Sequence, residues 1–217
     1  ELKKCVVYLD QLQADDVTAN GPTGWTYGYG TINEEQQAVT EFTEFPVLKD
    51  GQYKGGEKLP DETLGWTSLT RTGGHPGGTT SLRAIRRWTA DCDSRVFINS
   101  VISHAKEEGD GVRCRIVTQG RGVMSDATAH NSTQTQSIPP FDVKAGQYID
   151  FVVDCRANES HDSFQSKITI MQSVNKKVQR NWKSDDDFPD STEPGRMDAW
   201  SQLAQALLLT NEFIFVD

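Results

Sequence analysis

The sequence lacks two features that would point to common partners. No hydrophobic run approaches the roughly 20 residues that a membrane span needs, since the longest apolar stretch, 204–209, contains Gln205. Basic residues are the minority: 22 Lys and Arg stand against 31 Asp and Glu, for a formal net charge of −9. Nucleic-acid binding depends on a basic surface that releases counterions from phosphates. We therefore expect neither a membrane span nor a nucleic-acid partner.

Cysteine is scarce, and the common catalytic signatures are missing. The four cysteines show no C-x-x-C spacing, which excludes a zinc ribbon, a thioredoxin motif and, within this segment, a c-type haem attachment site. Buried free thiols are favoured, with a Cys114–Cys155 bridge as the alternative. The sequence has no G-x-S-x-G elbow, no H-E-x-x-H, no Walker loop and no Cys–His signature. We expect a protein without catalytic activity.

What is present indicates an all-β fold. Hydrophobic residues make up only 35% of the 217 residues, and 18 glycines accompany many short runs that alternate large and small side chains. Such runs, separated by turn residues and not by helices, are typical of an antiparallel sandwich. We therefore predict a jelly-roll-like antiparallel β-sandwich with short N- and C-terminal helices. Its strands are expected near 25–31, 39–46, 63–69, 82–89, 95–103, 111–118, 147–155 and 164–171.

Four segments follow from the change in composition along the chain. Residues 1–19 form an N-terminal helical stub, because apolar residues recur there at steps of three and four. The β-sandwich domain covers 20–172, and a polar, acidic linker covers 173–197. A C-terminal helical segment covers 198–217, where Asp198 can cap a helix with an apolar face.

Arginine is concentrated in the middle of the chain. Eight of the eleven arginines lie between 83 and 156, but only two of the eleven lysines do, which favours planar, bidentate recognition. A period of two puts Val112, Cys114 and Ile116 on one face of a strand, and Arg113 and Arg115 on the other. By the same period Ile149, Phe151 and Val153 face the core, and Asp150, Val152 and Asp154 face away from it.

Two interpretations of these arginines stay open. One of the neighbours Arg86 and Arg87 should lie near the core and need a carboxylate, which Asp150 or Asp154 could supply. Such pairs would brace the two sheets. Alternatively, the arginines recognise hydroxylated or anionic groups of a ligand.

Candidate ligand-binding residues combine a loop with polar strand faces. His75 lies in the Gly73–Gly78 cluster, where glycines let a ligand approach the backbone. Tryptophan and tyrosine can stack on sugar faces, although tryptophan in a sandwich is commonly a core residue. Trp66 is one of the aromatics able to stack in this way. The candidate site residues are His75, Arg86, Trp88, Arg113 and Asp154, with Trp25, Tyr27 and Tyr29 as further stacking surfaces.

An oxygen-rich turn could hold a structural calcium ion. Asp154, Asn158, Glu159 and Asp162 supply the ligand type that calcium prefers, although their spacing is not that of an EF-hand loop. The metal ligands predicted are Asp154, Asn158 and Asp162. The alternative is an Asx-rich turn that satisfies its own backbone.

Several motifs, in matching order, resemble the C-terminal β-sandwich of planctomycete-type cytochrome-c proteins. These are large exported proteins that join a c-type haem region to two domains of unknown function. The resemblance departs after Phe164, where the family usually continues with Thr-Trp and a nearby Pro, but this chain has Gln165–Ile168. The motifs are WTYGYG at 25–30, GGHPG at 73–77, IRRW at 85–88, GDGVR at 109–113, His130-Asn131, IDFVVDCR at 149–156 followed by Asn158, DSF at 162–164, and the ending Leu207–Asp217.

The resemblance implies a location and a role. It implies export to the periplasm or cell surface, with haem c elsewhere in a parent protein and no cofactor in this segment other than calcium. The first residue, Glu1, is preceded by no signal region, so we expect a processed product or an excised piece. The family's sandwich is known as carbohydrate-binding-module-like. We therefore expect non-catalytic binding of polysaccharide, next to other domains of the parent protein. The clustered arginines make sulfated glycans and glycans with uronic acid candidate ligands. The alternative is a structural or docking module without glycan affinity.

Overall fold

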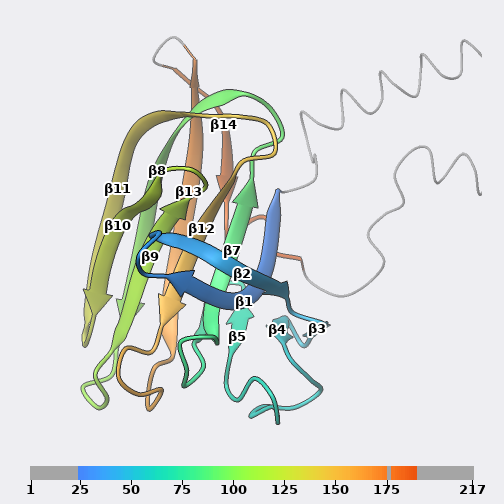
Figure 1. The fold of residues 1–217 in the computed structure, drawn as a ribbon, viewed down its shortest axis with the longest axis vertical. Helices are drawn as coiled ribbons and strands as arrows, with labels where there is room; N and C mark the ends of the chain where they lie inside the picture. Colours follow the sequence, from blue (N-terminus) through green and yellow to red (C-terminus); the bar gives the residue numbers. More distant parts are fainter. Residues whose placement is uncertain (1–23, 175–176, 190–217) are drawn as a thin grey trace, which may run out of the picture. The chain divides into compact units, whose positions relative to one another are not determined.

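The computed structural model describes residues 24–174 and 177–189, which form an antiparallel β-sandwich of two sheets (Figure 1). No helix occurs within these residues, so the predicted fold class is confirmed. The predicted terminal helices, in 1–19 and 198–217, lie outside the described residues. No helix in the described ranges is long and apolar enough to cross a membrane.

Both sheets are built from hydrogen-bonded antiparallel pairs. The six-stranded sheet consists, in spatial order, of β10 (Gly122–Ala129), β9 (Val112–Thr118), β12 (Tyr148–Asp154), β7 (Arg83–Thr89), β1 (Trp25–Asn33) and β2 (Ala38–Glu44). The eight-stranded sheet consists of β11 (Ser132–Val143), β8 (Ser94–His104), β13 (Phe164–Val174), β6 (Gly73–His75), β5 (Ser68–Thr70), β4 (Gln52–Lys54) and β3 (Val47–Lys49), with β14 (Lys177–Lys183) paired to β13.

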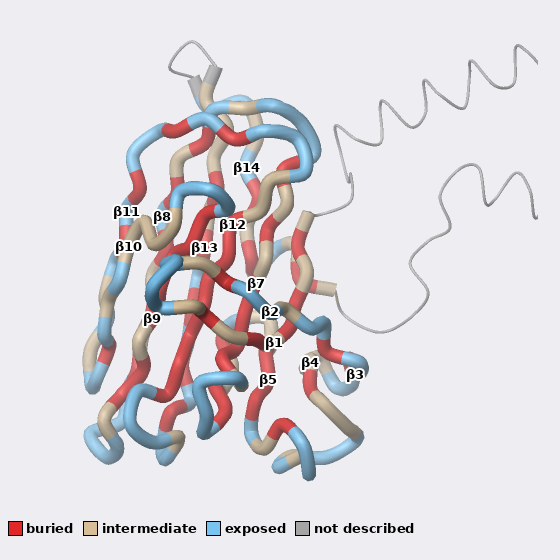
Figure 2. Tube along the Cα trace, in the orientation of Figure 1, coloured by how far each residue is buried: buried red, intermediate tan, exposed pale blue. Residues whose placement is uncertain are grey.

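The main core lies between the two sheets. Buried residues follow the central strands, and exposed residues lie mainly in the loops at both ends (Figure 2). Ile149, Phe151 and Val153 of β12 all belong to this core, as their period-two spacing predicted. Ile98 of β8 and Ile168 of β13 face them from the other sheet and are 1% exposed.

A second, smaller core lies on the outer face of the six-stranded sheet, beneath the β1–β2 hairpin. The β1–β2 hairpin runs across this face in front of the central strands (Figure 1), and β2 contacts β9. Five buried residues pack there: Ile32, Val39, Ile85, Val117 and Val152. Because the hairpin covers them, Asp150, Val152 and Asp154, which should face away from the main core, are buried as well.

Two details of the arginine interpretation need correction. Arg86 is the core arginine, at 2% exposed, but it has no carboxylate partner within the described chain. Its Nη2 donates to the carbonyl oxygens of Thr70 at 2.6 Å and Gly73 at 2.9 Å. Arg87, on the outer face, instead takes the buried Asp150 in a bidentate pair, with distances of 2.7 and 2.8 Å. Backbone carbonyls replace the expected carboxylate because the end of β5, at Thr70, and the start of β6, at Gly73, both present a carbonyl oxygen to Arg86.

The sandwich extends beyond the predicted boundary at residue 172. Residues 177–183, expected in an acidic linker, form β14, and Trp182 and Phe188 are buried in the main core. Asp187 accepts a hydrogen bond from Trp25 Nε1 at 3.2 Å. Apolar residues at wide spacing anchor this acidic segment, which composition alone does not reveal.

The described cysteines are free thiols. Cys114 and Cys155 are buried and not bridged, so the alternative of a disulfide between them is wrong. Burial raises the pKa of Cys114 to about 12 and that of Cys155 to about 11. Both therefore stay protonated and unreactive at neutral pH.

Candidate functional site

The tip of the β1–β2 hairpin carries a glutamate, Glu34, on a tight turn. The Asn33 side-chain oxygen accepts hydrogen bonds from the backbone N–H groups of Glu35 and Gln36, each at 2.9 Å. Gln37 closes the turn with a positive φ of 51° and donates from its side chain to the Glu34 carbonyl at 2.6 Å. These local bonds fix the turn.

Three neighbouring strands bring arginines and an aspartate to the same end of the six-stranded sheet, where β7 and β9 begin and β12 ends. Arg83 is the first residue of β7, Arg113 and Arg115 lie on β9, and Asp154 is the last residue of β12. The register between β12 and β9 pairs Asp154 with Arg113 and Val152 with Arg115. The Glu34 turn reaches this end of the sheet because the β1–β2 hairpin crosses the outer face.

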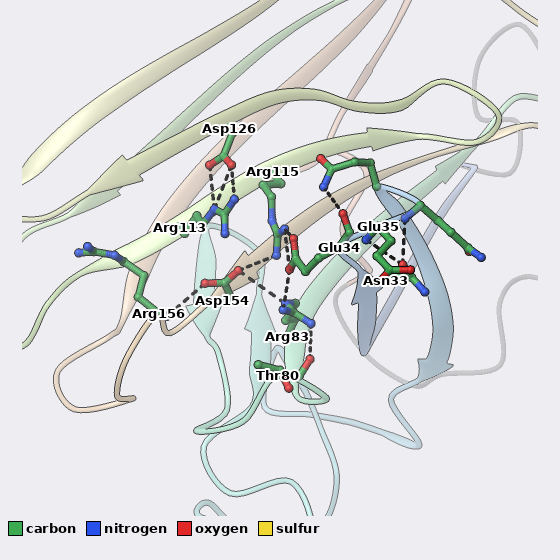
Figure 3. A network of polar contacts seen from close by, with 12 residues as sticks. Asn33, Glu34, Glu35, Thr80, Arg83, Arg113, Arg115, Asp126, Asp154 and Arg156 are labelled. Atoms are coloured by element: carbon green, nitrogen blue, oxygen red, sulfur yellow. Dashed lines mark hydrogen bonds and ion pairs between the residues drawn. The ribbon is translucent and has the colours of Figure 1, made fainter.

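The buried arginines share two carboxylates (Figure 3). Arg115 donates from Nη1 to both Glu34 oxygens, at 3.0 and 2.8 Å, and from Nη2 to Asp154 Oδ2 at 3.0 Å. Arg83 lies 3.3 Å from Glu34 through Nη2 and 3.6 Å from Asp154 through Nε, and its Nη1 donates to the Thr80 carbonyl. The side chains of Arg83 and Arg115 are only 5% and 1% exposed, whereas that of Glu34 is 54% exposed.

Two further arginines surround this network. Arg113 forms a bidentate pair with Asp126 of β10, in which both side chains are more than a third exposed. Arg156 donates its backbone N–H to Asp154 Oδ1 at 3.1 Å and its guanidinium to the Asp110 carbonyl. The hydrogen bond that Arg113 donates to Asp126 raises the pKa of Arg113, whereas burial lowers the pKa of Arg83 against the attraction of Asp154.

Five of these residues, Glu34, Arg83, Arg113, Asp154 and Arg156, line an open cleft of about 600 Å³. Its walls carry three arginines, two carboxylates and two threonines, and none of its lining residues is aromatic. Such a surface offers donors and acceptors for hydroxyl and anionic groups. The lining residues are Glu34, Gly78, Thr79, Thr80, Arg83, Arg113, Asp154, Cys155, Arg156 and Ala157.

The structure separates the residues expected to bind ligand. Arg113 and Asp154 line the cleft together. Trp25, Tyr27, Arg86 and Trp88 are at most 6% exposed and belong to the interior, where no sugar could stack on them. Tyr29 is half-buried against the main core. These side chains point inward because the register of β1 and β7 pairs Trp25 with Trp88 and Tyr27 with Arg86, which puts all four on the face that packs against the second sheet.

His75 lies beside the cleft and not in it. Burial lowers its pKa, and its ring Nδ1 lies 2.6 Å from the Pro76 carbonyl. Trp66, 45% exposed, has its ring centroid 6.3 Å from that of His75. Glu159 connects this pair to the cleft, since its carboxylate packs on Gly78, a lining residue, and acts electrostatically on His75. An exposed aromatic ring is therefore available near one end of the cleft.

Sequence reasoning missed three of the central residues as members of a site: Glu34, Arg83 and Arg115. Arg83 belongs to the arginine-rich segment, which was the available signal. Glu34 had only the polar turn between two predicted strands as a signal, and it lies 81 positions from its partner Arg115.

The three predicted calcium ligands do not share partners: Asp154 and Asn158 are hydrogen-bonded to different residues, and Oδ1 of Asp162 lies 3.8 Å from His104 Nε2. Asp154 binds arginine, and Asn158 donates to Asp110 Oδ1 at 3.1 Å and accepts from the Ser160 N–H at 3.0 Å. Asp162 is fully buried. In residues 24–174 and 177–189, no group of three or more His, Cys, Asp or Glu is placed to hold a metal. Calcium binding stays a prediction.

We expect Asp162→Asn to stabilise the protein at pH 8 in the presence of a chelator. Both Asp162 carboxylate oxygens lack a hydrogen-bond partner among the described residues, and burial together with the charge of Asp110 raises the pKa of Asp162 to about 7. Between pH 4 and 7 the folded state keeps a proton that the unfolded chain has lost. Wild-type stability should therefore fall as pH rises through this window, by up to about 1.4 kcal/mol per pH unit.

Thermal melts from pH 4 to 8 test this expectation. The Asn variant should match the wild type at pH 4 and melt higher at pH 8. Adding calcium at pH 8 is the second arm: if Asp162 is a calcium ligand, calcium should raise the melting temperature of the wild type and not that of the variant. A variant that melts lower than the wild type at pH 8 under chelation would contradict the expectation.

The chain matches no family model and no curated protein. Among solved structures it is similar to the C-terminal CBM6 of LamC, a marine laminarinase from Zobellia galactanivorans, with 16% identity over 45% of this chain and 76% of that one, at a TM-score of 0.28. It is also similar to the PA14 sugar-binding domain from an RTX adhesin, with 12% identity over 49% of this chain and 56% of that one, at 0.29.

A third similar structure is the GH26-CBM35 β-(1,4)-mannanase of Podospora anserina. The identity is 14% over 70% of this chain, and the TM-score is 0.31. The chain spans 28% of that enzyme. TM-scores this low carry no argument about this chain. The antiparallel sandwich is established by the strand pairing of the chain itself, and any function must be inferred from the cleft.

Proposed function

We propose that this sandwich is a non-catalytic module that binds polysaccharide in the cleft between the Glu34 turn, the loop before β7 and the loop after β12. The parent protein is an exported protein of the cytochrome-c type, in which the module brings the other domains to a glycan at the periplasm or cell surface. The resemblance of the sequence motifs supports this context.

The cleft carries the proposal. It has about 600 Å³ of space, which is enough for a small number of sugar units, and its walls combine guanidinium groups, carboxylates and threonine hydroxyls. Fork-shaped guanidinium donors held on strands can bind vicinal hydroxyls, carboxylates or sulfates. Trp66, outside the lining of the cleft, supplies an exposed ring beside His75, which lies three residues before the lining residue Gly78 in the chain. Acidic glycans, sulfated or containing uronic acid, suit the three arginines.

A structural role is the second candidate, because the arginines already have internal partners. Arg83 and Arg115 connect β7 and β9 to the hairpin through Glu34, and Arg115 binds Asp154. A module that only spaces or docks the parent's other domains would need this bracing and no ligand.

Arg113→Ala separates the two candidates. Because Arg113 and Asp126 are both more than a third exposed, losing the pair should cost less than about 1 kcal/mol. If the cleft binds glycans, affinity for an acidic oligosaccharide should fall by about tenfold, as expected for one charge-assisted hydrogen bond. Binding is measured first on an array of neutral, uronate and sulfated glycans, and then by calorimetry.

Arg95→Ala is the matched control. Arg95 also forms an exposed pair with an aspartate, Asp142 at 3.0 Å, but it does not line the cleft. The control should leave affinity unchanged. A wild-type protein that binds no glycan on the array would favour the structural role, and equal affinity losses in both variants would place the binding surface outside the cleft.

A further inference from the structure

The carboxylate of Glu34 occupies an arginine site that it does not fully satisfy. A single nitrogen of Arg115 contacts both Glu34 oxygens, and Arg83 reaches Glu34 only at 3.3 Å, beyond the usual range of a strong hydrogen bond. In the described part of the chain, Nε of Arg83 and Nε of Arg115 are buried without a hydrogen-bond partner. Each guanidinium group therefore keeps one donor without a hydrogen bond to a described residue, and that of Arg83 faces Asp154 at 3.6 Å.

Charge balance explains why a carboxylate is needed there. Arg83 and Arg115 are buried, and among residues 24–174 and 177–189 the one buried carboxylate that contacts them is that of Asp154, at 12% exposure. Two buried cations with one buried anion leave a charge that must be neutralised. Glu34 supplies the second anion from a different structural element, the hairpin tip, while remaining 54% exposed.

Glu34 also lies where a ligand would enter. It lines the cleft together with Arg83 and Asp154, and it contacts Arg115, which is not a lining residue, so a carboxylate in the cleft reaches both arginines by taking the place of Glu34. Releasing Glu34 into water would lose less pairing energy than releasing the buried Asp154, because the ion pairs of the half-exposed Glu34 are already partly screened by water.

We propose that Arg83 and Arg115 form a carboxylate-binding subsite whose internal occupant is Glu34, and that a uronic acid unit of the glycan binds by replacing the Glu34 carboxylate. This inference rests on the proposed function for the identity of the ligand. The planar guanidinium groups fit a planar carboxylate, and the subsite thereby selects uronate over neutral sugar units.

The replacement makes Glu34 a competitor of the ligand. An internal group that fills a site most of the time lowers the apparent affinity of the ligand by the fraction of molecules in which the site is free. Removing the Glu34 carboxylate should therefore increase affinity for uronates, whereas removing a residue that contacts the ligand would decrease it. The sign of the change distinguishes these two roles.

The first experiment uses acetate, which carries a carboxylate and no sugar. The full 217-residue chain is melted as wild type, Glu34→Ala and Glu34→Gln, in sodium acetate or sodium chloride of equal ionic strength. We expect both variants to melt lower than the wild type in chloride, and acetate to recover most of that loss in the variants while shifting the wild type little. Equal acetate shifts in all three proteins would overturn the subsite.

The second experiment measures affinity for an oligogalacturonate, a sulfated oligosaccharide and a neutral oligosaccharide. Glu34→Ala should bind the uronate about tenfold more tightly than the wild type, as expected if Glu34 fills the site about nine-tenths of the time. Glu35→Ala is the control, because Glu35 lies on the same turn and is exposed outside the arginine network. The isosteric Glu34→Gln provides the same comparison if the alanine variant does not fold.

The two proposals fail in different ways. Recovery by acetate without binding of any glycan would keep the carboxylate subsite and remove polysaccharide binding. Binding of glycans by the wild type, with no acetate effect and no gain in uronate affinity in either Glu34 variant, would keep the function and overturn the role of Glu34.

Discussion

Asp154→Asn should lower the free energy of unfolding by about 3–5 kcal/mol, because it removes the one buried anion of the arginine network. Asp154 accepts from Arg115 at 3.0 Å, lies 3.6 Å from Arg83, and accepts the backbone N–H of Arg156 at 3.1 Å. The substitution keeps the shape of the side chain and removes its charge, which leaves two buried guanidinium groups to share the exposed Glu34. A loss of this size is a large part of the stability of a typical domain. Urea unfolding measures it directly.

Asp126→Asn is the control for this substitution. It neutralises an aspartate of the same site, but Asp126 and its partner Arg113 are 40% and 37% exposed. An exposed pair is screened by water, so the loss should stay below about 1 kcal/mol. Similar small losses in both variants would show that water reaches Arg83 and Arg115 well enough to solvate them, and the charge argument for Glu34 would then lose its basis.

The sequence pattern predicted the inner face of the sandwich correctly and the outer face less well. A period of two placed Ile149, Phe151 and Val153 in the core, because alternation depends only on local backbone geometry. It also placed Val152 and Asp154 on the opposite face, yet both are buried. Their burial depends on a hairpin more than a hundred residues earlier in the chain, and no local pattern reports such a contact.

The arginine cluster predicted a charged site but not its members. Arg113 and Asp154 were expected and line the cleft, whereas Arg86 was expected and lies in the core with backbone carbonyls as partners. Whether an arginine next to another in sequence faces the core or the surface depends on the register of its strand. The pairing of Arg83 and Arg115 with Glu34 depends in addition on how far the β1–β2 hairpin bends over the sheet.

The alternation of aromatic residues and glycine in 25–30 indicated a strand, and the structure gives the glycines a specific role. Trp25 and Tyr27 fill the main core, while Gly28 and Gly30 lie where β2 passes very close to β1. A Cβ atom on Gly28 would lie 2.2 Å from the Thr43 carbonyl oxygen. The absence of side chains at these positions lets the hairpin bend over the sheet and carry Glu34 to the arginines.

Gly30→Ala should therefore destabilise the protein by about 3 kcal/mol, at the upper end of the usual cost of overpacking. The added Cβ would lie 1.9 Å from the Glu41 carbonyl oxygen, a backbone atom that cannot rotate away. Either β1 and β2 separate or the hairpin changes its curvature, and both outcomes expose the small core of Ile32, Val39 and Val117 beneath it. Urea unfolding measures the loss of stability, and amide hydrogen exchange should show reduced protection in β2.

Thr31→Ala tests the neighbouring position without a backbone clash. Thr31 donates from its hydroxyl to Glu41 Oε2 at 2.7 Å, an exposed hydrogen bond whose loss should cost about 1 kcal/mol or less. If Gly30→Ala and Thr31→Ala cost the same, close approach of the two strands does not shape the hairpin. If Gly30→Ala costs far more and also reproduces the acetate-dependent recovery of Glu34→Ala, the curvature of this one hairpin is what delivers the internal carboxylate to the cleft.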